Sequence, residues 1–306
     1  MEPLVQKILV VGGNGFVGKS DFPVSNGCAL SWLSSYKYKV NWLKGNALEP
    51  QTYSHLLPGA TAVVHTLGTL LEDARYKAAL KDGNVPALMG TFLSGLTGSG
   101  NPLEDPHKEG GYAQINHDAA FVTSKPEVEL PHPRAFVYVS AEDIFRPFIP
   151  ARYIETKRQA ELDISQMMST NPSYRGVYVR PSLIYHPHFR PLTSPVAVVL
   201  EAASSFHAKL PKGLPTPSGF LRSLARRSSD SASLVSPSPL DSVANALTIP
   251  PIHVDHVGEA ICIAADNARE DVTGVVDVQE MRRLIGWVAK GQASPPPSVA
   301  QQPQAQ

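Results

Sequence analysis

Short runs of apolar and β-branched residues recur along the chain, and segments of helical or turn character separate them. Continuously apolar runs of this length are typical of strands in a parallel sheet, because helices cover both faces of such a sheet. Their alternation with helical segments indicates βαβ units. We expect strands at 7–11, 38–43, 62–66, 134–140 and 176–180.

Two intervening segments show helical patterns. Residues 50–57 begin with a proline and are followed by Gly59, which is typical of a short helix with a glycine at its end. Residues 153–168 form a longer, charged pattern. Its apolar positions, which we expect on the inner face of the helix, are Ile154, Ala160, Leu162 and Ile164.

The order of these elements predicts an α/β fold, a Rossmann-like doubly wound parallel sheet with a small C-terminal substrate or lid lobe. We place the nucleotide-binding core at 1–185, with a catalytic-type segment at 134–185, and the second lobe at 186–290. A Ser/Pro-rich stretch at 210–250 is expected to be a poorly ordered excursion of that lobe, and 291–306 a disordered tail.

Charge and composition exclude some classes of partner. Lys plus Arg and Asp plus Glu both number 27, so no net field favours a nucleic acid. The two cysteines lack metal-ligand spacing, and no recognisable leader is present. The apolar run 195–206 is too short to span a bilayer. We expect it to be a core helix; contact with a partner enzyme or peripheral membrane association is the alternative.

Glycines follow the first predicted strand at a spacing that suits a dinucleotide. Gly12, Gly15 and Gly18 permit a tight turn and let backbone N–H groups approach a pyrophosphate. A purely structural turn is the alternative, because a glycine triplet alone is a weak signal. The strand before it favours the dinucleotide.

The sequence after Gly18 does not continue as such a unit. Pro23, Gly27 and many Ser and Asn residues prevent a three-turn helix there. The first crossover helix and the second strand are apparently missing, and residues 31–39 contain no acid to bind a ribose. We therefore expect a weakened NAD or NADP site, and the choice between the two cofactors stays open.

A possible acid/base pair lies in the segment "YIETK". Tyr153 and Lys157 are one helical turn apart, so an ammonium can favour the phenolate and lower its pKa. Ser140 ends the strand before this helix. On its own such a pair is usually surface decoration, but the glycines and Ser140 favour a catalytic site.

Two histidine-containing segments raise the question of a metal. His253, Asp255 and His256 read as a strand entering a helix, and residues 185–189 read as a turn around Pro187. We predict no metal at either segment.

The chain resembles the extended and atypical short-chain dehydrogenase/reductase superfamily in "VVHTLG", "VRPSLIY" and "IHVDHVGEAI", in addition to the motifs above. More narrowly, "GTLLEDARYK", "YIETKRQAE" and "SPLDSVANALTIPPIHVDHVGEAI" resemble fungal mitochondrial proteins of coenzyme Q biosynthesis. Those proteins are similar to the NADPH-binding accessory subunit of respiratory complex I.

The resemblance implies a role for each motif. Ser140, Tyr153 and Lys157 would be catalytic, with Tyr153 transferring the proton. Asn46, which replaces a familiar Asp, would lie beside the adenine. The remaining residues implied to line the cofactor are Gly12, Gly13, Asn14, Gly15, Phe16, Gly18, Thr66, Leu67, Gly68 and Pro181.

Three functions remain open. The first is an NAD(P)-dependent protein on the matrix side of the mitochondrial inner membrane that supports ubiquinone biosynthesis, with a redox step on a quinone precursor. The second is a non-catalytic accessory subunit of a coenzyme Q synthesis or respiratory complex, with a structural or defective nucleotide site. The third is an incomplete gene product whose intact form has one of these roles. The resemblance supports the predicted fold more strongly than it supports any particular reaction.

Overall fold

A computed structural model describes residues 6–17, 41–68, 134–144, 146, 151–169, 174–188, 193–211, 216–228 and 238–287. Its strands are β1 (Ile8–Val11), β2 (Ala62–His65), β3 (Arg134–Val139), β4 (Tyr174–Val179), β5 (Ile184–Tyr185), β6 (Ile252–His253) and β7 (Gly274–Val276). Its helices are η2 (Pro50–Thr52), η3 (Ser54–Leu56), α5 (Ala151–Ser169), α6 (Thr193–Lys209), α7 (Pro217–Ser228), α8 (Pro239–Thr248), α9 (Val254–Ala265) and α10 (Val278–Leu284).

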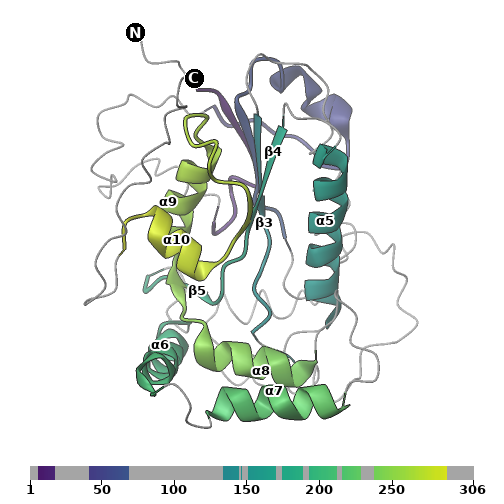
Figure 1. Cartoon of the computed structure of the whole chain (residues 1–306). Coiled ribbons are helices and arrows are strands. Elements are labelled where there is room, and N and C mark those ends of the chain that lie inside the picture. Colours follow the sequence, from purple (N-terminus) through teal and green to yellow (C-terminus); the bar gives the residue numbers. More distant parts are fainter. Residues whose placement is uncertain are drawn as a thin grey trace, which may run out of the picture.

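Five parallel strands form the main sheet in the order β1-β2-β3-β4-β7. Helix α5 covers one face, and α9 and α10 cover the other (Figure 1). Strands that all run in one direction need crossover connections, which place helices on the sheet faces. The doubly wound α/β prediction is therefore confirmed.

Alternate strand residues build two separate cores on the two faces of the sheet. Val64, Val137 and Val177 belong to the core under α9 and α10. Phe136 and Tyr138 belong to the core under α5. Because side chains alternate along a strand, one apolar run supplies both cores, and each fully buried side chain contributes roughly 1.5–3 kcal/mol.

Helix α5 covers the predicted segment and extends it at both ends. Ile154, Ala160 and Ile164 are buried, as predicted, but Leu162 is 54% exposed. The buried positions follow each other at helical spacing, whereas Leu162 lies about 200° around the helix from both Ala160 and Ile164. The assignment of Leu162 to the inner face was therefore wrong.

The N-terminal part differs from its prediction in two places. Residues 41–43 form no strand, and Trp42 and Leu43 are mostly exposed. Among the described strands none pairs with the outer edge of β1, although its N–H and C=O groups could accept a further strand there. The segment 50–57 forms two 3₁₀ turns rather than one α-helix, and Gly59 follows with φ 73°. Residues 18–40 lie outside the described residues. They include Gly18 and the stretch from which we predicted the first crossover helix to be missing.

The predicted poorly ordered stretch 210–250 contains two helices, α7 and α8. Its prolines do not prevent this, because Pro217 and Pro239 are the first residues of these helices, where a missing N–H costs nothing. The Ser238 side chain also caps α8 by accepting a hydrogen bond from Leu240 N–H. The expectation of disorder was wrong for these segments. The predicted tail lies outside the described residues.

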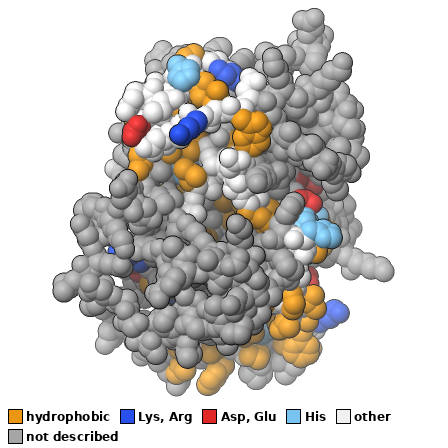
Figure 2. All heavy atoms as spheres, turned by 180° about the vertical axis from the view of Figure 1, so that it is seen from behind, with side chains coloured by type: hydrophobic (Ala, Val, Ile, Leu, Met, Phe, Trp, Pro, Cys, Tyr) orange, Lys and Arg blue, Asp and Glu red, His pale blue; other side chains and the backbone are white. Residues whose placement is uncertain are grey.

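Hydrophobic side chains gather at the end of the molecule that carries α6 and α7 (Figure 2). Exposed there are Val196, Val198, Val199, Phe206, Phe220 and Leu224. The run 195–206 is thus helical, but Ala197 and Ser204 are its only buried residues, so it is not the core helix that we predicted. None of the described helices has the length and hydrophobicity of a membrane-spanning segment.

Candidate functional site

The predicted site residues follow the carboxyl ends of neighbouring strands. The glycine loop follows β1, Thr66 to Gly68 follow β2, and Ser140 follows β3. Because these strands are parallel and adjacent, the three segments meet at one edge of the sheet. This edge is where open α/β sheets bind their ligands.

The first turn of the glycine loop lies against Thr66. Gly12 has φ +91°, and a Cβ placed on it would lie 2.7 Å from Thr66 Oγ1. The turn is closed by Gly15 N–H, which donates to Gly12 O at 2.8 Å, while Thr66 Oγ1 donates to Val11 O at 3.0 Å. Only glycine fits position 12, both for its backbone conformation and for the space available.

Gly12→Ala is expected to destabilise the protein by about 1–3 kcal/mol, because the new Cβ combines left-handed strain with a clash. Gly59→Ala is the matched control, since Gly59 has φ +73° and nothing within 4 Å of the added Cβ. Urea unfolding of both variants checks this. Equal losses would show that the approach of Thr66 has no energetic consequence.

Lys157 is buried between the sheet and α5, with an exposed fraction of 2%. Its Nζ donates to Val139 O at 2.8 Å and to Leu67 O at 3.3 Å, and it lies 4.7 Å from the centre of the Tyr138 ring. Burial lowers the pKa of Lys157 from 10.5 to about 7, and the charge of Glu161 opposes this shift. The ammonium therefore joins the ends of β2 and β3 and is poised to lose its proton near neutral pH.

The next helical turn back carries Tyr153, which is half-buried. The pKa of Tyr138 is raised well above its ordinary value, first by burial and then by the charge of Tyr153. Lys157 thus lies beside the Tyr138 ring, and Tyr153 precedes it by one turn of α5. The structure brings the predicted pair to one place, but the Lys157 ammonium is bound to two backbone carbonyls.

Ser140 is buried and is contacted by a charged network that the sequence analysis missed. Arg158 Nη1 lies 3.4 Å from Ser140 Oγ and donates to Glu161 Oε1 at 2.7 Å. Arg180 donates to the same carboxylate through Nε at 3.0 Å. The i, i+3 spacing of Arg158 and Glu161 was a signal in the sequence. No pattern in the sequence indicated that Arg180 also binds the Glu161 carboxylate.

His65, the last residue of β2, was also missed. It is fully buried, neither ring nitrogen has a hydrogen-bond partner among the described residues, and its ring lies 5.7 Å from that of Tyr138. Burial, with a smaller contribution from the charge of Lys157, lowers its pKa from 6.5 to about 3. His65 is therefore a neutral ring beneath the site at physiological pH.

The segment after Ser140 is anchored to α8. Asp143 and Arg146 form a buried ion pair with a shortest distance of 2.6 Å. Arg146 N–H donates to Ser242 Oγ at 2.8 Å, and Asn245 Nδ2 donates to Asp143 O at 3.0 Å. The lobe built from α6 to α8 thereby fixes the backbone that follows Ser140.

The remaining predicted residues have varied surroundings. Asn46 is exposed, and its amide is bound locally, with Nδ2 donating to Glu49 Oε1 and Oδ1 accepting from Leu48 N–H. Pro181 is buried, and its carbonyl accepts from Glu142 N–H at 2.8 Å. Gly13, Phe16 and Leu67 are half-buried, and Asn14 and Gly68 are exposed.

The strand order and the glycine turn after the first strand define the class as Rossmann-type α/β proteins. Comparison with known proteins narrows this class. The chain belongs to the same family as MIOREX complex component 2 of Saccharomyces cerevisiae. The two proteins are 31% identical over 212 residues, which is 60% of this chain and 75% of the yeast protein.

Solved structures with similar folds are more distant. A 3-oxoacyl-[acyl-carrier protein] reductase from Brucella melitensis has a TM-score of 0.49 at 11% identity, covering 89% of each chain. RMD from Pseudomonas aeruginosa, solved with NADPH, has a TM-score of 0.47 at 17% identity, covering 94% of this chain and 81% of its own. No family model matches the chain.

Proposed function

We propose that this protein binds NAD or NADP and carries out a redox step on a quinone precursor in mitochondrial ubiquinone biosynthesis. The observation that carries the proposal is the position of the Lys157 ammonium against Val139 O and the Tyr138 ring, at the carboxyl end of the strand that leads to Ser140, with Tyr153 one helical turn before it. This arrangement supports a site that combines a phenol, an ammonium and a hydroxyl at the ligand-binding edge of the sheet. Sequence resemblance supplies the substrate class and the compartment.

The residues at this edge fit a dinucleotide in part. Gly12 allows a tight turn packed against Thr66 and Leu67 at the end of the first strand, and such a glycine turn is the form that a pyrophosphate-binding loop takes. Leu67 and Gly68 continue the same edge beside it. Asn46 keeps its amide in local hydrogen bonds, so a contact to adenine would compete with them. We therefore propose a weak cofactor site.

Each catalytic side chain has a role in the proposed reaction. Gly12, Leu67 and Gly68 would hold a reduced nicotinamide cofactor, which would supply a hydride to a carbonyl carbon of the quinone precursor. Tyr153 would donate its phenolic proton to the carbonyl oxygen, and Ser140 would orient that oxygen. The positive charge of Lys157 favours the phenolate that remains. Because the pKa of Lys157 is about 7, this support weakens as the pH rises above neutral.

A second candidate is an accessory subunit without turnover. The yeast relative is a component of the MIOREX complex, which favours a role in an assembly. Lys157 also bonds to Val139 O and Leu67 O, which gives it a structural role without any cofactor. Partners would be proteins of coenzyme Q synthesis or the respiratory chain, on the matrix side of the inner membrane.

Tyr153→Phe separates the two candidates. With NADPH or NADH and a soluble quinone such as 1,2-naphthoquinone, we expect turnover to fall at least ~100-fold, while cofactor affinity changes less than about twofold. Tyr174→Phe is the control, since Tyr174 lies at the opposite, amino-terminal end of β4. Unchanged turnover would remove Tyr153 from the reaction. Binding without any turnover in the wild type would favour the accessory subunit.

A further inference from the structure

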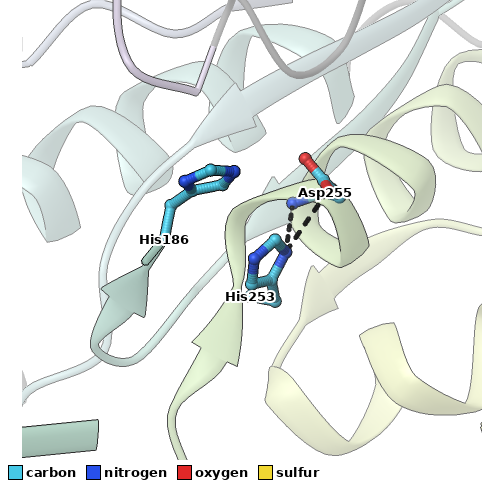
Figure 3. Close-up of side chains that lie close together, drawn as sticks. All are labelled: His186, His253 and Asp255. Carbon is cyan, nitrogen blue, oxygen red and sulfur yellow. Dashed lines mark hydrogen bonds and ion pairs between the residues drawn. The ribbon is translucent and has the colours of Figure 1, made fainter. Parts of the chain in front are cut away.

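The small sheet formed by β5 and β6 brings together two segments that are far apart in the sequence. Its parallel register pairs Ile184 with Ile252 and Tyr185 with His253. His186 follows directly after β5, so its ring comes to lie 5.0 Å from the ring of His253. Asp255, in the first turn of α9, completes the cluster (Figure 3). The prediction of no metal treated the two histidine segments separately.

We propose that His186, His253 and Asp255 form a binding site for one divalent transition-metal ion of the Zn²⁺ type. Two imidazoles and one carboxylate are a ligand set that Zn²⁺ accepts, with the remaining coordination position taken by water. Each residue offers one ligand atom, and these three atoms lie within 4.8 Å of one another. The proposal is independent of the proposed redox function.

The distances are close to those of a metal centre. Metal bonds of about 2.1 Å in tetrahedral geometry separate ligand atoms by roughly 3.4 Å. His253 Nδ1 and Asp255 Oδ2 already lie 3.5 Å apart. The nitrogen of His186 must move closer to the other two ligand atoms. Rotation of its side chain can achieve this, because His186 is only half-buried and directly follows the last residue of β5.

Of the two backbone hydrogen bonds that now orient the rings, the one to His253 is long and the one to His186 is of ordinary length. Asp255 N–H donates to His253 Nδ1 at 3.3 Å, beyond the usual range for such bonds. His188 N–H donates to His186 Nδ1 at 3.1 Å. A metal at His253 Nδ1 would replace the long backbone contact with a stronger bond.

The charge state of the cluster also suits a cation. Burial lowers the pKa of both His186 and His253, so both rings are neutral and keep a lone pair at pH 7. Other groups close by are His188, His256 and Arg282. The pKa of His256 is also lowered. Burial is the main cause, and the charge of Arg282 adds to it. The Asp255 carboxylate is the anionic ligand that would offset the charge of the ion.

A metal here would clamp the end of β5 to the start of α9. Strand β5 follows the segment that contains Pro181, which borders the predicted nicotinamide position, and α9 packs on the main sheet. Zn²⁺ is therefore expected to raise the thermal unfolding temperature, since it binds the folded cluster and not the separated segments.

The test is calorimetric titration of Zn²⁺ into the untagged, chelator-treated full chain. We expect one ion per chain, and at least a tenfold loss of affinity in His186→Asn, His253→Asn and Asp255→Asn. Asparagine suits the histidine positions because its side-chain oxygen can still accept the backbone N–H bonds and cap α9. His55→Asn, at an exposed histidine outside the cluster, is the control and should bind as the wild type.

Circular dichroism of each metal-free variant shows whether it folds, and the folded variants decide the outcome. Absence of stoichiometric Zn²⁺ binding by the wild type would overturn the proposal. Folded cluster variants that bind Zn²⁺ as tightly as His55→Asn would overturn it too. Loss of the Zn²⁺-induced rise in unfolding temperature, confined to the cluster variants, would support it. None of these three measurements depends on NADPH binding or on turnover.

Discussion

Lys157→Met is expected to remove a rise of about 1.4 kcal/mol per pH unit in the free energy of unfolding between about pH 7 and pH 10. In that window the unfolded chain keeps a proton on this lysine, whereas the folded chain has already lost it. Stability of the wild type therefore increases as the pH rises, and below pH 7 the full cost of the buried charge is present. A methionine does not titrate, so this dependence disappears.

Urea unfolding at closely spaced pH values between 6 and 10 measures the effect. Lys7→Met is the control, because Lys7 also donates to a backbone carbonyl, Pro58 O at 2.9 Å, but is exposed. Methionine at position 157 leaves Val139 O and Leu67 O without a donor, which offsets part of the stability gained at low pH. The slope is therefore the diagnostic quantity. Identical slopes for the wild type and Lys157→Met would contradict the buried-ammonium account.

The second large effect is expected on the acid side, from His65. Between about pH 6.5 and pH 3 the unfolded chain takes up a proton on this histidine and the folded chain does not, because burial holds its pKa at about 3. Stability of the wild type should fall by about 1.4 kcal/mol for each unit of acidification in this range. His65→Phe should abolish that part of the loss and keep a ring against Tyr138.

Phenylalanine also removes two buried nitrogens that have no partner in the part of the chain that the structure describes, so we expect some added stability even at pH 7. Denaturant unfolding from pH 7 to pH 4 of His65→Phe and of the exposed-site control His55→Phe measures both contributions. If the free energy of unfolding falls equally with acidification in the wild type and in His65→Phe, His65 is charged in the folded state. Our description of its surroundings would then be wrong.

The strands of the sheet were predictable because their apolar runs reflect burial on two faces. Residues such as Val64 and Val137 pack under α9 and α10, while their neighbours pack under α5. Of the strand expected at 38–43 the structure describes only residues 41–43, which form no strand, although the outer edge of β1 has no partner among the described strands. The local pattern of apolar residues does not determine whether a segment pairs with that edge.

The site was predictable in its residue types more than in its contacts. The spacing of Tyr153 and Lys157 predicted one face of a helix, both residues lie on α5, and Lys157 lies beside Tyr138. The bonds of Lys157 to Val139 O and Leu67 O depend on how far β2 and β3 extend. The spacing of two residues on a helix gives no information about the ends of these strands. The pairing of Tyr185 with His253 was equally hidden, because a parallel register joins segments with no local signal in common.

The most direct test of a weakened dinucleotide site is equilibrium titration of the wild type with NADPH and NADH, followed by reduced-nicotinamide fluorescence. We predict saturable binding with a Kd on the order of 0.1–1 mM, weakened further by Gly12→Ala but not by Gly59→Ala. Failure to bind either cofactor at millimolar concentration would contradict the assignment of the site. Tight, low-micromolar binding would contradict its weakening.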